Sequence, residues 1–146
     1  MVILSKFAEN LDNLIFDHNI SQKELAEKTG LDKASISRYR KGNCMPNLKS
    51  VVKLAEYFNC SIDFLIGKSV TEKHGDFLPC PPFSERLQFY VNNYEGTSYK
   101  LCKTVHLPDN RFYDWLKGTR FPTIDNVEKL ADYFHCTIDC FLGREN

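Results

Sequence analysis

Apolar residues recur at helical spacing along the first 67 residues, and polar residues fill the positions between them. The pattern divides into five short segments. Side chains that can cap backbone amides stand where the later segments begin, at Ser21, Asp32, Asn47 and Ser61. Glycines suited to left-handed helix ends follow the second, third and fifth segments, at Gly30, Gly42 and Gly67. The pattern predicts five helices, and we find no β pattern.

The same plan occurs twice in the chain. Residues 54–67, LAEYFNCSIDFLIG, match residues 130–143, LADYFHCTIDCFLG, at eight of 14 positions, with an offset of 76. The offset also pairs Lys41-Gly42 with Lys117-Gly118 and Pro46 with Pro122 without a gap. A period this long indicates tandem domains, since solenoid repeats are shorter. We predict a first domain at 1–67, a linker at 68–81 that ends in a Pro-rich stretch, and a second domain at 82–146.

The helical spacing of the apolar residues also predicts which side chains form the core of each domain. In the first domain the predicted inward residues are Phe7, Leu11, Leu14, Ile15, Leu25, Ala26, Leu48, Val51, Leu54, Ala55, Phe58, Ile62 and Leu65. In the second they are Leu87, Val91, Leu101, Cys102, Phe112, Ile124, Val127, Leu130, Ala131, Phe134 and Ile138. The fold class predicted is therefore all-α, with two domains joined by a short linker.

Composition narrows the functional classes. The 146 residues carry 19 basic and 19 acidic side chains, so a nucleic-acid site must rest on a local patch. Without an apolar run long enough for a membrane span, we expect a cytoplasmic protein with no membrane partner. The six cysteines are then expected to be reduced.

Residues 22–42, QKELAEKTGLDKASISRYRKG, predict two short helices around a tight turn, the second polar on one face and basic at its end. Together with Pro46, Leu54-Ala55 and residues 61–67, this stretch closely resembles the Cro/phage-repressor-like (XRE-type) helix-turn-helix family. The resemblance covers 3–67 strongly and 83–143 more weakly. It implies two tandem lambda-repressor-like domains in a transcriptional regulator that binds double-stranded operator DNA, usually as a homodimer, at the nucleoid.

The resemblance also implies roles for individual residues. Gln22 is expected to contact phosphate, and the outward face of the recognition helix would present Lys33, Ala34, Ser35 and Arg38 to base edges. Arg40, Lys41 and Asn43 would hold the DNA backbone. Composition supports this placement, because six basic residues and no acids occur between Lys33 and Ala55.

The second domain departs from the pattern. Ser98 stands in place of Gln22, His106 in place of Gly30, and Pro108 in place of Asp32. Four bases and four acids fall between Asp109 and Ala131, so the local charge is zero. The aromatic residues Phe112, Tyr113 and Trp115 are expected to add surface to its third helix. The DNA contacts that it could retain are Asn110, Arg111, Lys117 and Arg120.

Three roles stay open for the second domain: weak DNA reading, dimerisation or partner binding, and sensing of an unknown effector. We favour reduced or absent DNA contact, because acids that face phosphates oppose binding.

Other chemistry has weaker support in the sequence. Cys136 and Cys140 are four residues apart, but they match packing positions of the repeat and are expected to be buried thiols without metal. Cys44 and Cys80 lie in predicted loops and are candidates for exposed, oxidisable thiols. Asp63 and Asp139 recur in the repeat, where a role in the first turn of a helix is favoured over catalysis. No cofactor is expected, and an enzyme is improbable.

The sequence therefore predicts a regulator, in the first instance a repressor, that reads the major groove with helix 33–41. The alternative is a protein-interaction module, antitoxin-like or regulator-binding, with little DNA binding. A thiol or metal sensor is a third hypothesis.

Overall fold

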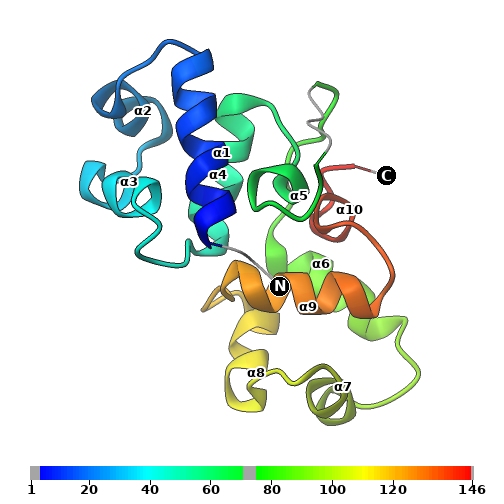
Figure 1. The fold of residues 1–146 in the computed structure, drawn as a ribbon. Coiled ribbons are helices and arrows are strands. Elements are labelled where there is room, and N and C mark those ends of the chain that lie inside the picture. Colours follow the sequence, from blue (N-terminus) through cyan, green and yellow to red (C-terminus); the bar gives the residue numbers. More distant parts are fainter. Residues whose placement is uncertain (1–3, 71–74, 146) are drawn as a thin grey trace. The chain divides into compact units, whose positions relative to one another are not determined.

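The computed structural model describes residues 4–70 and 75–145, and within these ranges it contains ten α-helices and no β-strand (Figure 1). The predicted all-α class is confirmed for this part of the chain. The chain divides into two compact units, Met1–Asp76 and Phe77–Asn146, which we call unit 1 and unit 2. The division falls inside the stretch 68–81 that the sequence predicts as a linker. No helix of the described residues is both long and apolar enough to span a bilayer.

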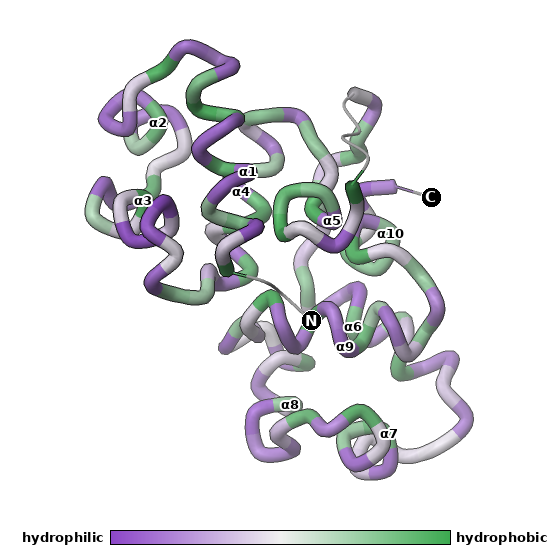
Figure 2. Tube along the Cα trace, in the orientation of Figure 1, coloured by the Kyte–Doolittle hydropathy of each residue, from purple (hydrophilic) through white to green (hydrophobic). Residues whose placement is uncertain are grey.

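Unit 1 contains five helices that follow the predicted segments closely. They are α1 (Leu4–Asp17), α2 (Gln22–Thr29), α3 (Lys33–Arg40), α4 (Leu48–Phe58) and α5 (Ile62–Leu65). All but one of its predicted inward residues are buried, and the exception, Ala26, is half-buried. Hydrophilic positions predominate along α2 and α3, whereas α5 is mostly hydrophobic (Figure 2). Most of the surface area that α2 and α3 expose is therefore polar.

Unit 2 contains the corresponding five helices. They are α6 (Phe83–Asn92), α7 (Ser98–Val105), α8 (Asp109–Lys117), α9 (Ile124–Tyr133) and α10 (Ile138–Leu142). Its core includes Leu87, Leu101, Phe112, Leu130 and Ile138, each with no exposed surface. That this unit is a second helix-turn-helix domain stays a prediction.

Helix ends are satisfied as the sequence predicts. Ser21 Oγ accepts a hydrogen bond from the Glu24 amide at 3.0 Å, and Ser61 Oγ accepts one from the Phe64 amide at 3.1 Å. Asn47 caps α4 in the same way, at 2.8 Å. These bonds satisfy amide groups that a helix leaves without intrahelical partners, which fixes where each helix begins.

The two units repeat tertiary hydrogen bonds at the offset of 76. In unit 1, Asn10 Nδ2 donates to the Phe64 carbonyl at 2.8 Å and to the Leu65 carbonyl at 3.4 Å. At the matching position of unit 2, Arg86 donates from Nη2 to the Cys140 carbonyl and from Nε to the Phe141 carbonyl, both at 2.9 Å. A polar side chain on the first helix thus satisfies the same two carbonyls of the fifth helix in both units.

Several predicted side-chain placements are wrong. Val91, Phe134, Cys136 and Cys140 are half-buried, although all four are predicted to be buried. Tyr90 replaces the buried Leu14 of unit 1 and places its hydroxyl 3.8 Å from Cys136 Sγ, so a polar group lies near this edge of the core. Trp115 does not add surface, since its side chain is buried, and Phe112 is buried as its place in the predicted core requires. Cys44 and Cys80 are half-buried rather than exposed.

Residues 77–80 belong to unit 2 through specific contacts. The Leu78 amide donates to the Arg144 carbonyl at 2.7 Å, and the Arg144 guanidinium lies 4.4 Å from the centre of the Phe77 ring. Arg144 also pairs with Asp139 at 2.6 Å, and both side chains are 1% exposed. Unit 2 therefore begins before its first helix.

Candidate nucleic-acid interface

The core of unit 1 fixes α3 in place and leaves its polar side exposed. Ile36 and Tyr39 point inward, where the Tyr39 ring packs edge-on against Phe7 and its hydroxyl donates to Ser50 Oγ at 3.2 Å. Gly30 has a φ of +74° and ends α2, so the chain turns sharply before α3. Asp32 caps α3 through the Ala34 amide at 3.4 Å. Two short helices joined by a tight turn form the geometry that can place the second helix in a major groove.

The outward side of α3 carries the residues predicted to read DNA. Lys33, Ala34 and Arg38 are exposed, and Ser35 is half-buried. Arg38 Nη2 donates to Ser35 Oγ at 3.1 Å, which holds the guanidinium along the helix surface. Arg and Lys side chains on such a face can reach guanine acceptors. The structure therefore brings these four residues together on one exposed helix side.

Gln22 and Arg40 are held by other parts of unit 1. Arg40 Nε donates to Asp12 Oδ1 at 2.6 Å, and Arg40 Nη1 donates to Gln22 Oε1 at 3.1 Å. Gln22 Nε2 in turn donates to the Lys33 carbonyl at 3.3 Å. These bonds connect α1, α2 and α3 through both ends of α3. The sequence did not reveal this role of Asp12, because 28 residues separate it from Arg40 and no short spacing links them.

The positions after α3 complete a basic surface. Lys41, Asn43 and Lys49 are exposed. Together with Lys33 and Arg38 they form a group of cations and one amide that is free of acids from residue 33 to residue 55. Lys41 and Asn43 are thus accessible, and their contacts with the DNA backbone stay a prediction.

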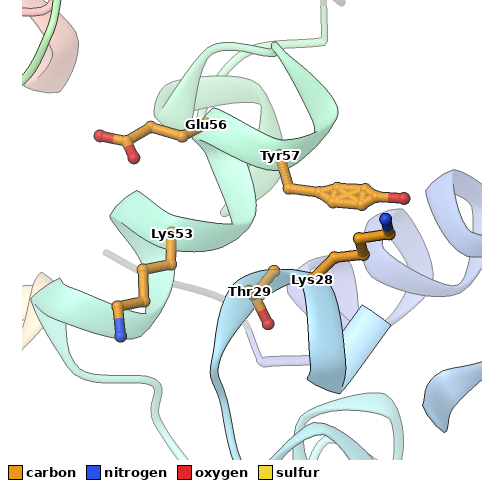
Figure 3. A pocket seen from close by; sticks show the side chains of 5 residues that line it. All are labelled: Lys28, Thr29, Lys53, Glu56 and Tyr57. Atoms are coloured by element: carbon orange, nitrogen blue, oxygen red, sulfur yellow. The ribbon is translucent and has the colours of Figure 1, made fainter. Parts of the chain in front are cut away.

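Lys53 has a different environment from the other cations of this run. It lies on a groove of about 410 Å³ between α2 and α4, together with Lys28, Thr29, Glu56 and Tyr57 (Figure 3). The Lys53 side chain points toward the end of α2, and Glu56 points away from it (Figure 3). A Cβ atom at Gly30 would lie 3.9 Å from Lys53 Nζ. The ammonium therefore lies at the negative end of the α2 dipole, where a cation is favourable.

Comparison with known proteins assigns unit 1. Residues 17–65, from the end of α1 to the end of α5, match the family model described as helix-turn-helix. An uncharacterised HTH-type transcriptional regulator, RC1195, of Rickettsia conorii is 30% identical over 74 residues, which are 48% of this chain and 68% of that protein. The chain belongs to the helix-turn-helix family. Family membership makes DNA binding in transcriptional regulation the general function of the chain.

Two further relatives differ in their named activity. The cryptic phage CTXphi transcriptional repressor RstR of Vibrio cholerae is 29% identical over 73 residues, which are 50% of this chain and 65% of that protein. The transcriptional activator BcrR of Enterococcus faecalis is 31% identical over 61 residues, which are 42% of this chain and 30% of that protein. The matched region thus spans about two thirds of the first two relatives and less than a third of BcrR.

Among solved structures, a transcriptional regulator from Listeria innocua aligns with a TM-score of 0.40 and 27% identity. The alignment covers 72% of this chain and 91% of that one.

Unit 2 distributes its four candidate DNA contacts over different places. Asn110 lies on a groove of about 310 Å³ between α7 and α8, beside the exposed rings of Tyr99 and Tyr113. Arg111 and Arg120 lie on a second groove of about 320 Å³ between α8 and the start of α9. Lys117 is exposed at the end of α8. The positions that correspond to Lys33, Ala34, Ser35 and Arg38 thus hold two acids, one amide and one base, which are Asp109, Asp114, Asn110 and Arg111.

Asp109 contributes to the character of the α7–α8 groove. Cys102, which is 3% exposed, lies at this groove with Asp109. Burial, and to a smaller extent the Asp109 carboxylate, together raise the pKa of the Cys102 thiol to about 11. The thiol therefore stays protonated at neutral pH, and the carboxylate dominates the charge of this groove.

Unit 2 holds α8 with fewer polar contacts than unit 1 uses for α3. Pro108 precedes α8 without a side-chain cap, whereas Asp32 caps α3. The Asp12–Arg40 ion pair is replaced by a hydrogen bond from Gln88 Nε2 to the Leu116 carbonyl at 2.9 Å. His106 adopts the left-handed conformation of Gly30, with a φ of +63°, and its carbonyl accepts from Lys129 at 3.4 Å. The turn is therefore retained even though the glycine is lost.

Proposed function

We propose that the chain binds double-stranded DNA sequence-specifically through α3 of unit 1 and thereby regulates transcription, in the first instance as a repressor. The supporting observation is the exposed side of α3, where Lys33 and Arg38 flank Ala34 and Ser35 and no acid occurs from residue 33 to residue 55. Cations here neutralise phosphates and reach guanine acceptors. Occupation of an operator would block polymerase. Binding, and no chemical reaction, is the proposed activity.

Arg40 and Gln22 support this function from behind the helix. Their bonds to Asp12 and to the Lys33 carbonyl fix α3 against α1 and α2 before DNA arrives. Fixing the reading side chains in advance lowers the ordering cost of binding. We expect Gln22 and Arg40 to act chiefly as positioning residues, with any phosphate contact made from this constrained position.

Specific affinity requires a second reader, because one short helix contacts only a few base pairs. We propose that a homodimer supplies it. The name of RstR as a repressor favours repression, and the name of BcrR as an activator keeps polarity open to experiment. Binding to chromosomal DNA would place the protein in the cytoplasm, at the nucleoid.

A second candidate function is protein binding by unit 2. The observation that favours it is a set of exposed large rings, with Phe89, Tyr99, Tyr113 and Phe121 each more than half exposed. Aromatic residues are enriched at protein interfaces. Such an interface would serve dimerisation, an effector or a regulatory partner.

Fluorescence anisotropy of a labelled mixed-sequence duplex with the full chain tests the DNA proposal. The double variant Lys33→Ala/Arg38→Ala should lower affinity at least tenfold, and salt should weaken the residual binding less steeply. Lys6→Ala/Lys28→Ala removes the same charge from other parts of unit 1 and is the control. Equal losses in both variants, or no binding by the wild-type chain at low salt, would refute α3 as the reader.

A further inference from the structure

Unit 2 has a basic groove on the side of α8 away from Asp109. Arg111 on α8 and Arg120 on the following loop line it, and the start of α9 adds Thr123 and Asn126. The groove measures about 320 Å³. The arginines are its two formally charged lining residues among those that the structure describes, so the groove favours an anion.

The polar groups of this groove suit a phosphate. Arg111 is exposed, and the Arg120 side chain is 65% exposed. Arg120 Nε lies 3.5 Å from Asp114 Oδ2, an exposed ion pair of small energy that a phosphate can displace. Thr123 makes no side-chain cap to α9, which leaves its hydroxyl without that competing bond. Arginine offers a fork of donors that matches phosphate oxygens.

An apolar side chain stands beside these cations. Phe121 also lines the groove and is 54% exposed. A nucleic-acid backbone offers apolar sugar faces between its phosphates. The combination of two guanidinium groups and one exposed ring therefore fits a sugar–phosphate chain better than it fits a free anion.

The side of α8 that carries Asp109 lacks these properties. Asp109 stands at the position of Lys33, and Tyr113 and Tyr99 are exposed beside it. A carboxylate at this position repels phosphates, and the exposed Tyr99 and Tyr113 line the α7–α8 groove together with it. The two properties that α3 combines, base reading and phosphate binding, are therefore separated in unit 2.

We propose that unit 2 binds the phosphate backbone of duplex DNA through the α8–α9 groove, with Arg111 and Arg120 as the contacts, and does not read bases. This inference rests on the proposed function of unit 1 as the base reader. Unit 2 then adds affinity that is independent of sequence, and specificity comes from α3.

The test uses the full chain and two mixed-sequence duplexes, one rich in G·C and one rich in A·T, titrated over 50–200 mM salt. Arg111→Ala/Arg120→Ala should lower affinity several-fold, and by the same factor on both duplexes. The slope of log affinity against log salt should fall by about 1.8, which corresponds to two phosphate contacts. Asp114→Asn, which frees Arg120 from its carboxylate, should raise affinity on both duplexes.

The matched control is Lys100→Ala/Lys103→Ala, which removes the same charge from α7 of the same unit. Binding that is weakened equally by both double variants would show a general charge effect and would overturn the groove. A loss confined to one duplex would overturn the absence of base reading. Unchanged DNA affinity in Arg111→Ala/Arg120→Ala would also overturn the proposal. A protein partner would then be the remaining candidate for this groove.

Lys33→Ala/Arg38→Ala in the same assay separates this inference from the proposed function. Loss of binding in that variant alone supports α3 and rejects the unit 2 groove. Loss only in the Arg111→Ala/Arg120→Ala variant rejects α3 as the reader. Intact binding in both rejects both proposals.

Discussion

Helices α3 and α8 occupy matching positions in two copies of one helical plan, and they have diverged in charge on their outward side. Their inward positions are equivalent, because Ile36 and Tyr39 are replaced by Phe112 and Trp115 and all four are buried. Their outward positions are not, because Lys33 and Arg38 are replaced by Asp109 and Asp114. Burial constrains the first set strongly, whereas exposed positions tolerate a change of charge. The comparison separates the residues that maintain the fold from those that determine the ligand.

The largest expected effect concerns the ion pair that closes unit 2. Arg144 and Asp139 are both 1% exposed, whereas Lys68, at the position of Arg144 in unit 1, is exposed. Arg144→Met should destabilise unit 2 by about 3–5 kcal/mol, because it leaves a buried carboxylate without this partner. Denaturant unfolding followed by fluorescence of Trp115, the single tryptophan, reports on unit 2. Lys68→Met is the matched control and should leave the Trp115 transition unchanged.

A smaller effect should follow from giving α8 the outward charges of α3. The variant Asp109→Lys/Asp114→Arg reverses two charges and should strengthen binding of a mixed-sequence duplex by about tenfold, since each new phosphate contact releases counterions. Anisotropy at two salt concentrations measures the gain, and circular dichroism checks that the helices persist. If affinity stays at the wild-type value, then features of unit 2 other than charge exclude DNA from α8.

Equal effects are expected where the two units use the same cap. Ser21 caps α2 and Thr97 caps α7, with amide-to-oxygen distances of 3.0 and 3.1 Å. Each replacement by alanine should destabilise its own unit by about 1 kcal/mol. Amide hydrogen exchange measures both units in one full-length chain. A markedly larger loss in one unit would show that the repeated cap no longer has equivalent roles.

The smallest expected effect is at the turn between the two helices. His106 holds a φ of +63°, a conformation that costs a residue with a side chain about 1 kcal/mol. His106→Gly should therefore stabilise unit 2 by about 0.5–1 kcal/mol, and the reciprocal Gly30→His should destabilise unit 1 by a similar amount. Thermal unfolding and hydrogen exchange report on the pair. Destabilisation by His106→Gly would indicate that the imidazole makes a favourable contact that outweighs the strain.

The sequence predicted the helices of both units because their boundaries depend on local chemistry. Ser21, Asp32 and Asn47 cap the helices that they were expected to start, and Gly30 takes the expected left-handed conformation. Local caps and a spacing of three to four residues are visible in a single sequence. Helix assignments based on them need no knowledge of the tertiary fold.

The bonds that position the site were not visible in the same way. Asp12, Arg40 and Gln22 come together from three helices, and Asn10 reaches carbonyls more than 50 residues away. The half-burial of Val91 and Phe134 was missed because position 14 and position 90 carry side chains of different polarity, which changes the edge of the core. Such contacts depend on which elements meet, and periodicity alone does not report this.

The position of Phe77 beside Arg144 has a practical consequence for dividing this protein. A fragment that starts at Pro82, just before α6, would lose the Phe77 ring over the guanidinium and the Leu78 amide bond to the Arg144 carbonyl. Expressed fragments and recombined chimaeras of unit 2 should therefore start at residue 77 or earlier. A fragment cut at the helix boundary would lose contacts that hold unit 2 together. Its lower stability would then be mistaken for a property of unit 2 itself.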